Sequence, residues 1–479
     1  MGQTVARPRL LVVGLSIVVL TVAVLQTAVV PVLGVIADQL QASTVAVSWA
    51  VTANLLAAAA ATPLIGRLAD LYRKKQVLLV VLAVVLAGSI LAAATSSLVL
   101  LIAARVLQAA SFALYPICIA ILREELSPDR MVSAMAVLSG TLGFGGGTGL
   151  VVVGLLMSGD AGYHRVFWLT TAFTVLVIVI VLTVVPDRPR AATGSIDWLG
   201  AMGLAVGLSA LLLAITQGTS WGWVSPRTLA TAAGGVAVLI GWWFWERRAA
   251  RPLVSTRMLA QRSMLFTNLA TIFVGMGLYF AFLGLTQFVQ IDDDVVGYGF
   301  DASVLEASVV YLLPGALTGF LIALVSGRFI DRFGARPVLV VAAVAGIAGF
   351  LFIAFAHAAP WQVIIASILA NAYISLGYGA LPALVVADSD AGETGVATGM
   401  NAIARTIGSS TAAAIVAVLL SRTSAAGTPA ESSFTAIFVG GAATAMLAMV
   451  LIAVSRPRVR ATESDEARYE SRAMNHEWG

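Results

Sequence analysis

The feature that most constrains this chain is a series of apolar stretches that recur along nearly its whole length. A helix of about 20 apolar residues crosses the hydrocarbon core of a bilayer, and these stretches lack the alternation of barrel strands. Hydrophobic residues make up 59% of the chain and charged residues 11%, too few charges to cover a soluble fold of this length. We therefore predict an all-α polytopic membrane protein with fourteen spans, near residues 11–36, 44–66, 76–95, 98–121, 132–157, 166–185, 198–216, 228–245, 263–290, 304–326, 337–356, 361–386, 397–420 and 434–455.

The basic residues favour one orientation of these spans. Arg7 and Arg9 precede the first apolar run, which continues to Ile36 and exceeds the apolar core of a cleaved signal peptide, so we expect it to remain as a span. With the N-terminus inside, 23 of the 28 Lys and Arg residues fall in inner segments, three in outer loops and two within spans. This bias predicts a multi-pass protein of the inner (plasma) membrane with both termini in the cytoplasm.

A repeated loop predicts how the spans are grouped. The sequence GRLADLYRKK begins at Gly66 and GRFIDRFGAR begins at Gly327, each after the second span of a six-span set. Two such loops indicate a duplicated bundle, and transporters built from repeats place the substrate site between the halves. We predict an N-terminal six-helix bundle, an inserted helix pair with a basic linker, a C-terminal six-helix bundle and a cytoplasmic tail, at 1–190, 191–262, 263–455 and 456–479 respectively.

The residue types in the repeated loops suit a gate on the cytoplasmic side. Gly66 and Gly327 would allow two backbones to approach closely. Asp70 and Asp331 can accept hydrogen bonds from the N-terminus of a neighbouring helix and pair with nearby arginines. The alternative is that these residues only cap helices and set topology. The predicted gate residues are Gly66, Asp70, Arg73, Lys74, Gly327, Asp331 and Arg332.

Four stretches give the chain a resemblance to a known family. GRLADLYRKK resembles the loop motif of the major facilitator superfamily, although Arg73 stands at its usual second glycine; RVLQAA resembles the helix-4 motif. GETGVATGMNAIARTIGSS and ERRAARPLVSTRML resemble the helix-13 signature and the linker of the fourteen-helix drug:proton antiporter branch. The resemblance implies a major facilitator fold, with two six-helix bundles and two inserted helices, and links Arg105 to proton or substrate handling.

Two departures from the family pattern bear on proton exchange. The helix-5 glycine motif keeps Gly145, Gly149 and Gly154, but Leu150 replaces its proline and Val153 one of its glycines. Many relatives carry an aspartate in helix 1 where this chain has Val22. These departures favour, as an alternative, a dedicated exporter of one lipid or metabolite.

Two arginines lie inside apolar spans, where an unpaired charge is costly. Arg105 and Gln108 project from one face of their helix, so we interpret them as part of a proton or substrate path; the alternative is a structural arginine bonded to backbone carbonyls of adjacent helices. Arg405 follows Asn401 by about one turn. That pair would bind an anionic or polar group, or brace the bundle.

Proton coupling usually requires a carboxylate within the membrane. No span carries one at its centre, and Glu306, near the start of a span that contains Pro314 and Gly315, is the nearest candidate. A surface carboxylate is the alternative. Uncharged side chains suggest a large amphipathic cavity, although such groups often only bond across helices. The cavity candidates are Gln26, Asn54, Tyr279, Gln287, Tyr311, Asn371 and Tyr378.

The remaining residues exclude several classes of protein. Cys118 is the single cysteine and there are three histidines, so we expect no disulfide, metal or other cofactor. The only lysines, Lys74 and Lys75, do not follow a glycine, so no ATP-binding loop exists. The basic linker ERRAARPLVSTRMLAQR would lie in the membrane interface or be a solvated connection.

We therefore predict a secondary active exporter of hydrophobic or amphipathic small molecules, working by alternating access and proton antiport. The alternatives are a dedicated lipid or metabolite exporter, an uncoupled facilitator and, more distantly, a membrane-embedded enzyme, receptor or channel. The expected partners are a small-molecule substrate, protons and the lipid bilayer, with no nucleic acid, and we expect a monomer.

Overall fold

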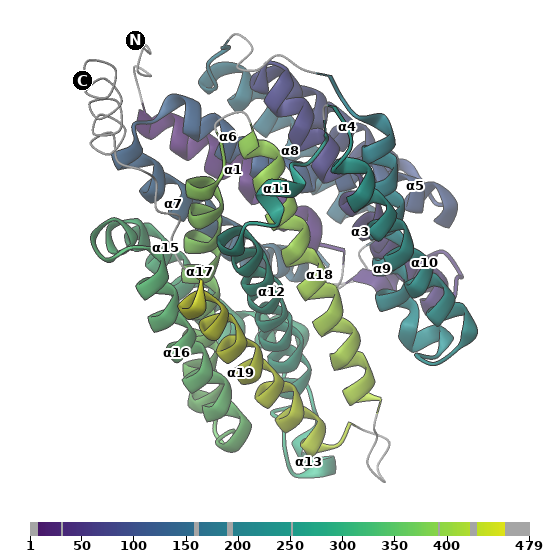
Figure 1. Cartoon of the computed structure of the whole chain (residues 1–479). Coiled ribbons are helices and arrows are strands. Elements are labelled where there is room, and N and C mark those ends of the chain that lie inside the picture. Colours follow the sequence, from purple (N-terminus) through teal and green to yellow (C-terminus); the bar gives the residue numbers. More distant parts are fainter. Residues whose placement is uncertain are drawn as a thin grey trace, which may run out of the picture.

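The computed structural model describes residues 8–29, 32–157, 162–188, 195–250, 252–390, 393–421 and 429–455. The predicted tail, 456–479, lies outside these residues. The regular structure is helical, with long helices joined by short connections (Figure 1). In chain order the elements are α1 (Pro8–Thr27), α2 (Leu33–Gln39), α3 (Thr44–Leu71), α4 (Lys74–Ala94), α5 (Leu98–Gln108), η2 (Ala109–Ala113), α6 (Leu114–Glu125), α7 (Pro128–Leu156), α8 (His164–Val184), α9 (Trp198–Trp221), α10 (Pro226–Glu246), α11 (Thr256–Leu259), α12 (Arg262–Val289), α13 (Asp293–Val296), α14 (Val304–Glu306), η3 (Ala307–Leu312), α15 (Leu313–Phe333), α16 (Ala335–Phe355), α17 (Pro360–Asp388), α18 (Thr394–Leu420) and α19 (Glu431–Val454).

Among the described residues, fourteen helical segments are long and apolar enough to cross a membrane, which confirms the predicted number of spans. They are α1, α3, α4, the continuous α5–η2–α6, α7, α8, α9, α10, α12, η3 with α15, α16, α17, α18 and α19. All-α architecture follows because a backbone in hydrocarbon must satisfy its own hydrogen bonds, which a helix does within one segment.

Two spans contain irregularities that the predicted continuous helices lacked. The first ends at Thr27 rather than near residue 36, and α2 begins separately at Leu33. Pro31 lies between them, and proline has no backbone N–H with which to continue a helix. Span ten is interrupted by η3, a π-helix, directly before Pro314 in the first turn of α15. Pro314 again lacks the N–H for a regular helical hydrogen bond, and π-helical segments within helices often accompany functional sites.

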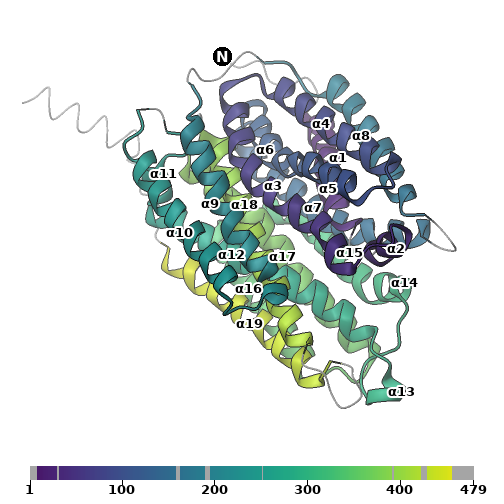
Figure 2. The same cartoon turned by 90° about the vertical axis from the view of Figure 1, so that its right-hand side faces the viewer.

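The helices form two groups that match the duplication in the sequence. The N-terminal half, α1–α8, is purple to blue in Figure 1, and the C-terminal half, α12–α19, is teal through green to yellow. The inserted pair α9 and α10 lies beside the seam between the halves (Figure 2). There α9 packs against α3 of the first half and α18 of the second.

The apolar side chains of the basic linker pack against the helices. Leu253, Val254 and Met258 are buried in a cluster with residues of α3, α9, α10, α12, α17 and α18. These three apolar side chains therefore pack against the protein. They help to attach the inserted helix pair to the seam, because burying apolar side chains against both elements removes them from a polar surrounding.

Small residues set how closely α12 and α18 cross. A Cβ added to Gly408 would lie 1.9 Å from the carbonyl oxygen of Ile272, and one added to Gly275 would lie 2.5 Å from that of Arg405. Neither obstacle is a flexible side chain, so the backbones themselves would have to separate. Glycine at these two positions thus allows the close helix contact that drives packing where no hydrophobic effect operates between helices.

We predict that Gly408→Ala destabilises the protein by about 1–3 kcal/mol, the usual cost of overpacking. The matched control is Gly234→Ala, because a Cβ at that helical glycine meets nothing within 4 Å. Thermal unfolding of both variants in the same detergent checks this. Equal melting temperatures for the two variants would contradict the proposed crossing.

Candidate functional site

A cavity of about 180 Å³ lies between the two halves. About 10–15 Å³ accommodates one water molecule, so the cavity can hold a small molecule with its hydration. Helices of both halves contribute to its wall. The lining residues are Ala23, Gln26, Thr27, Val51, Asn54, Leu55, Arg105, Phe112, Leu142, Gly146, Leu278, Tyr279, Ala281, Phe282, Leu283, Leu285, Leu312, Ala316, Asn371, Ile374, Tyr378, Arg405, Thr406 and Ser409.

Most of the predicted cavity residues border this space, and some do not. Gln26, Asn54, Tyr279, Asn371 and Tyr378 line it, together with both intramembrane arginines. Two candidates are corrected by the structure. The Gln287 side chain is exposed and does not line the cavity, and the buried Tyr311 ring stacks on Phe300 at a centroid distance of 5.5 Å. Helix phase explains both cases, because a span has several faces and only one meets the cavity.

Arg105 is held in place by neighbouring helices while it borders the cavity. Only 2% of its surface is exposed. Its Nη1 donates to the carbonyl oxygen of Leu25 in α1 at 3.2 Å and to Oε1 of Gln108 at 2.9 Å, and its Nε donates to the carbonyl oxygen of Ala50 in α3 at 3.3 Å. Arg105 therefore combines the two predicted alternatives, a cavity residue and a structural arginine.

The polar network continues away from Arg105. Gln108 Nε2 donates to Oγ of Ser89 in α4 at 3.0 Å, and Asn54 Nδ2 donates to the carbonyl oxygen of Arg105 at 2.7 Å. The span changes to the 3₁₀-helix η2 directly after Gln108. Gln108 itself does not border the cavity; it orients the arginine and ties α5 to α4, so it is a positioning residue.

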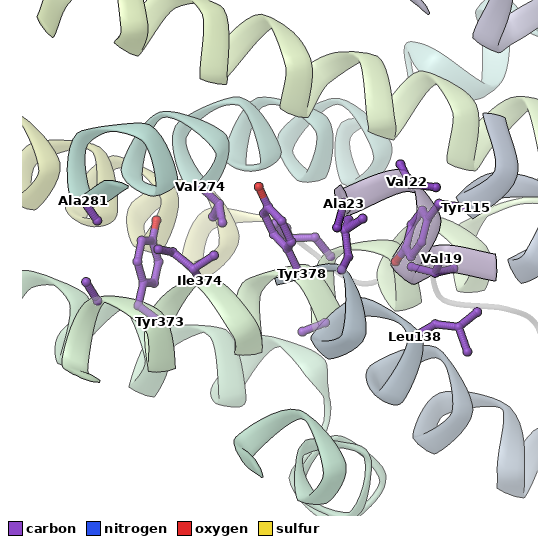
Figure 3. Packing of buried hydrophobic residues seen from close by; sticks show 14 of the residues in the cluster. Val19, Val22, Ala23, Tyr115, Leu138, Val274, Ala281, Tyr373, Ile374 and Tyr378 are labelled. Atoms are coloured by element: carbon purple, nitrogen blue, oxygen red, sulfur yellow. The ribbon is translucent and has the colours of Figure 1, made fainter. Parts of the chain in front are cut away.

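Arg405 has a different environment from Arg105. Its guanidinium carbon lies 5.3 Å from the ring centroid of Tyr115 and 4.9 Å from that of Tyr378. These tyrosines belong to α6 and α17, one in each half, and Figure 3 shows both rings in the packing around Ala23. Arg405 thus connects the halves through cation–π contacts, which strengthen where water is excluded.

Asn401, predicted to act with Arg405, lies away from the cavity. Its Nδ2 donates to Oδ1 of Asn268 at 3.0 Å and to Oγ1 of Thr271 at 2.7 Å, both in α12. This arrangement matches the predicted alternative of a brace, since the two bonds join α18 to α12 within one half.

Glu306 is placed where it does not reach the cavity. It ends the short α14, its side chain is exposed, and its backbone N–H donates to Oγ of Ser303 at 3.2 Å. The interruption of this span at η3 leaves the residue outside the cavity wall. Glu306 therefore does not lie beside the substrate path as predicted, and its carboxylate is exposed like that of a surface residue.

The helix-5 glycines pack α7 against α1. A Cβ at Gly145 would lie 2.7 Å from Cβ of Ala23, and one at Gly149 would lie 2.9 Å from Oγ1 of Thr27. Gly154 has more room, with the nearest atom, in Leu305, at 3.6 Å. Val22, where relatives carry an aspartate, is a buried core residue.

The two repeated loops lie at one end of the bundle, called here the paired-loop end and formed by residues 66–75 and 327–336. There α3 crosses α18, because a Cβ on Gly66 would lie 2.7 Å from the carbonyl oxygen of Gly395. The buried carboxylate of Asp70 accepts backbone N–H groups of Gly395 at 2.9 Å and Val396 at 3.0 Å. A carboxylate at a helix N-terminus satisfies otherwise unpaired donors and the positive end of the helix dipole.

The second crossing corresponds to the first but is weaker in polar contacts. A Cβ on Gly327 of α15 would lie 2.3 Å from Cα of Ser133 in α7. Among the described residues, Asp331 accepts one hydrogen bond, from Oγ of Ser133 at 3.3 Å, and its side chain is exposed. The two halves therefore meet twice through equivalent helix pairs, with a buried carboxylate in only one of them.

The other predicted gate cations do not join the halves. Arg73 pairs with Asp187 at 3.0 Å, and Lys74 pairs with Glu124, both inside the N-terminal half. The Arg332 guanidinium lies 5.2 Å from the ring of Phe333 on its own helix. These side chains shape the paired-loop end of each half rather than the contact between them.

Arg123, which the sequence analysis did not single out, joins the halves. From the end of α6 it donates to Oγ and the carbonyl oxygen of Ser389, at 3.1 and 3.0 Å, and to Thr394. The sequence showed it only as one of the basic residues that follow span four. Beside this contact, burial and the charge of Asp390 raise the pKa of Glu393 above its ordinary value, an effect that Arg67 partly offsets.

Comparisons with known proteins agree with this architecture. A sequence model described as the Major Facilitator Superfamily matches residues 15–198, 192–413 and 295–475. The chain is 29% identical over 400 residues to the tetracenomycin C resistance and export protein of Streptomyces glaucescens, an alignment covering 80% of this chain and 71% of that protein. It is 28% identical over 321 residues to the uridine/deoxyuridine transporter of Lactococcus lactis subsp. cremoris, covering 65% of this chain and 66% of that one.

Solved structures share the fold at low sequence identity. The human organic anion transporter MFSD10 (TETRAN) matches with a TM-score of 0.64 at 15% identity, over 93% of this chain and 99% of that one. A mutant of the nucleoside transporter NupG matches with a TM-score of 0.56 at 16% identity, over 93% and 100% of the two chains. At such identities the likeness concerns the fold alone.

We predict that Asp70→Asn opens the paired-loop end. Loss of charge weakens two hydrogen bonds, and bonds to charged groups contribute about 1.5–3 kcal/mol, so the open population should rise roughly tenfold or more. Spin labels at Gln76 and Arg328, both exposed and in opposite halves, would report the distance distribution in a Cys118→Ser background.

The matched control is Asp331→Asn, which removes charge from a carboxylate with a single long bond. We expect a much smaller change in the same distances. If both variants broaden the distribution equally, Asp70 is not the principal latch.

Proposed function

Since the chain belongs to the major facilitator superfamily, we propose that it exports hydrophobic or amphipathic small molecules by alternating access, with inward proton movement as the driving reaction. The family and its fold are those of transporters rather than enzymes. The observation that carries the proposal is a cavity walled by both halves while the contacts of Asp70 and Arg123 join those halves at one end.

Alternating access requires that the cavity open to one side at a time. In this conformation hydrogen bonds of Asp70 and Arg123 tie the halves at the paired-loop end, whereas a Cβ added to Gly154 would still have room beside Leu305. We take the paired-loop end as cytoplasmic, because the basic residues concentrate on that side. Rocking of the halves would release these contacts and expose the cavity to the cytoplasm of the plasma membrane.

The relatives support export without naming a substrate. One is a resistance and export protein, and another, from Mycobacterium tuberculosis, is a multidrug resistance protein B homolog that is 26% identical over 389 residues. Others are nucleoside transporters. The wall of the cavity, mostly apolar with scattered amides and hydroxyls, suits an amphipathic molecule, so we propose efflux of such compounds, with antibiotic resistance as a consequence.

Proton coupling has a specific structural setting in this proposal. The described cavity lining contains no aspartate or glutamate, so we place the proton-sensitive contact at Asp70 rather than in the cavity. Protonation there would remove the charge that the N-terminus of α18 binds and would favour opening. The alternatives are an uncoupled facilitator and a dedicated lipid or metabolite exporter; Val22 and Leu150 favour these. We propose a monomer in the lipid bilayer.

We predict that liposomes containing the protein accumulate an amphipathic fluorophore when their lumen is acidic, and that nigericin, which dissipates the proton gradient, abolishes accumulation. Arg105→Ala should lower the initial rate about tenfold or more, because it leaves two carbonyls and Gln108 without their donor. Arg227→Ala, at an exposed arginine over Trp221, is the control. Uptake that stops at equilibrium and is unaffected by nigericin would favour the facilitator.

We predict that Glu306→Gln leaves accumulation driven by the pH gradient within about twofold of the wild-type rate, a difference of about 0.4 kcal/mol, because its exposed carboxylate lies outside the cavity. The same liposome assay measures this, at matched protein content. A variant that still binds the fluorophore but no longer responds to the gradient would restore Glu306 as the proton carrier.

A further inference from the structure

Arg405 presents a cation to the cavity without a protein anion beside it. Among the described residues its guanidinium has no hydrogen bond or ion pair; its neighbours are the rings of Tyr115 and Tyr378. Aromatic faces stabilise a guanidinium but do not neutralise it or occupy its five N–H donors. The side chain is half-buried and part of the cavity wall. Its donors are therefore available to a molecule inside the cavity.

The charge of the whole cavity has one sign. Its described lining includes two arginines and no acidic residue. Arg105 bonds to uncharged oxygen atoms of Leu25, Ala50 and Gln108, so its charge also lacks a counter-ion. Two uncompensated guanidinium groups in a site of low polarity disfavour a cation there and favour an anion, which would offset part of their desolvation.

Uncharged donors surround the same space. The Tyr378 hydroxyl is buried and has no hydrogen-bond partner, and its ring lies against the Arg405 guanidinium. Tyr378 and Arg405 both line the cavity, and a hydroxyl and a guanidinium together form a typical pair of donors for an oxyanion. The rest of the wall, including Phe112, Tyr279 and Phe282, is apolar or aromatic and would contact an apolar body.

We propose that the molecule bound in this cavity is an amphipathic organic anion, with an apolar ring or chain and one carboxylate or sulfonate group held by Arg405 and the Tyr378 hydroxyl. This inference rests on the proposed function and names its substrate class. It also separates the two arginines, because Arg105 is fixed by the protein and Arg405 is free for the ligand.

The charge of the ligand bears on how export is driven. An interior-negative membrane potential favours outward movement of an anion. An anionic substrate therefore draws on the potential directly, even though the described cavity wall holds no carboxylate to exchange a proton. The absence of an acidic group from this wall is then consistent with the substrate, because such a group would repel it.

Binding of three versions of one neutral fluorophore tests the proposal: a carboxylate, the corresponding amide and a trimethylammonium derivative. Fluorescence anisotropy with the purified full chain in detergent gives each Kd. We expect the carboxylate to bind about tenfold or more tightly than either of the others. Equal or tighter binding of the trimethylammonium compound would overturn the proposal.

Variants of Arg405 separate binding from bracing. Arg405→Gln should remove the preference for the carboxylate over the amide, and Arg405→Lys should keep much of it, because it keeps the charge. If Arg405→Gln weakens all three compounds by the same factor, the residue is only a brace and the proposal fails. Arg227→Gln, at the exposed arginine over Trp221, is the control and should leave all three Kd values unchanged.

Two further measurements keep the test decisive. If Arg405→Gln fails to fold, Tyr378→Phe can replace it, because this variant keeps the ring and removes the unpartnered hydroxyl. Tyr378→Phe should weaken carboxylate binding about tenfold and leave amide binding unchanged, and equal effects on both compounds would overturn the proposal.

Transport in liposomes separates the proposed export from the proposed anion site. Carboxylate-selective binding without transport would overturn export and support the anion site, whereas transport that prefers the trimethylammonium compound would overturn the anion site and support export.

Discussion

The structure depends on the requirement that every polar group inside a bilayer find its partner within the protein. Arg105 illustrates this requirement. Its guanidinium is bonded to the carbonyl oxygens of Leu25 and Ala50 and to Gln108, which in turn is bonded to Ser89. One charged side chain thus joins four spans of the N-terminal half. Moving any of these helices would leave a buried donor or acceptor unpaired. We therefore expect this wall of the cavity to be rigid.

The contacts between the two halves combine close backbone packing with polar pairing. Two equivalent crossings, Gly66 with Gly395 and Gly327 with Ser133, bring backbones too close for larger residues. A transporter must break such contacts in each cycle, so their strength has to be moderate. Backbone contact supplies precise alignment, and the polar bonds of Asp70 supply a stabilisation that changes with charge. The duplicated sequence therefore produces two similar crossings, one with a buried carboxylate that accepts two backbone N–H groups and one with an exposed carboxylate.

The cavity combines these two kinds of construction. Its arginines come from opposite halves, yet one is saturated with hydrogen bonds and the other rests between aromatic rings. A charge that is saturated stabilises the protein in all conformations. A charge that lacks an anion is stabilised best when a ligand provides one. Tyr115 and Tyr378, which flank Arg405 from the two halves, make that site sensitive to how the halves are placed.

The sequence by itself determined the fourteen spans, the duplication and the family, because length, hydropathy and motif spacing are properties of the chain alone. It did not determine which face of a helix meets which neighbour. Gln287 and Glu306 are exposed and do not line the cavity, and Arg123 reaches across to Ser389. These outcomes depend on helix phase, interruptions and the crossing of segments far apart in sequence. Only tertiary packing decides them, since side-chain direction acquires a partner only when the helices have assembled.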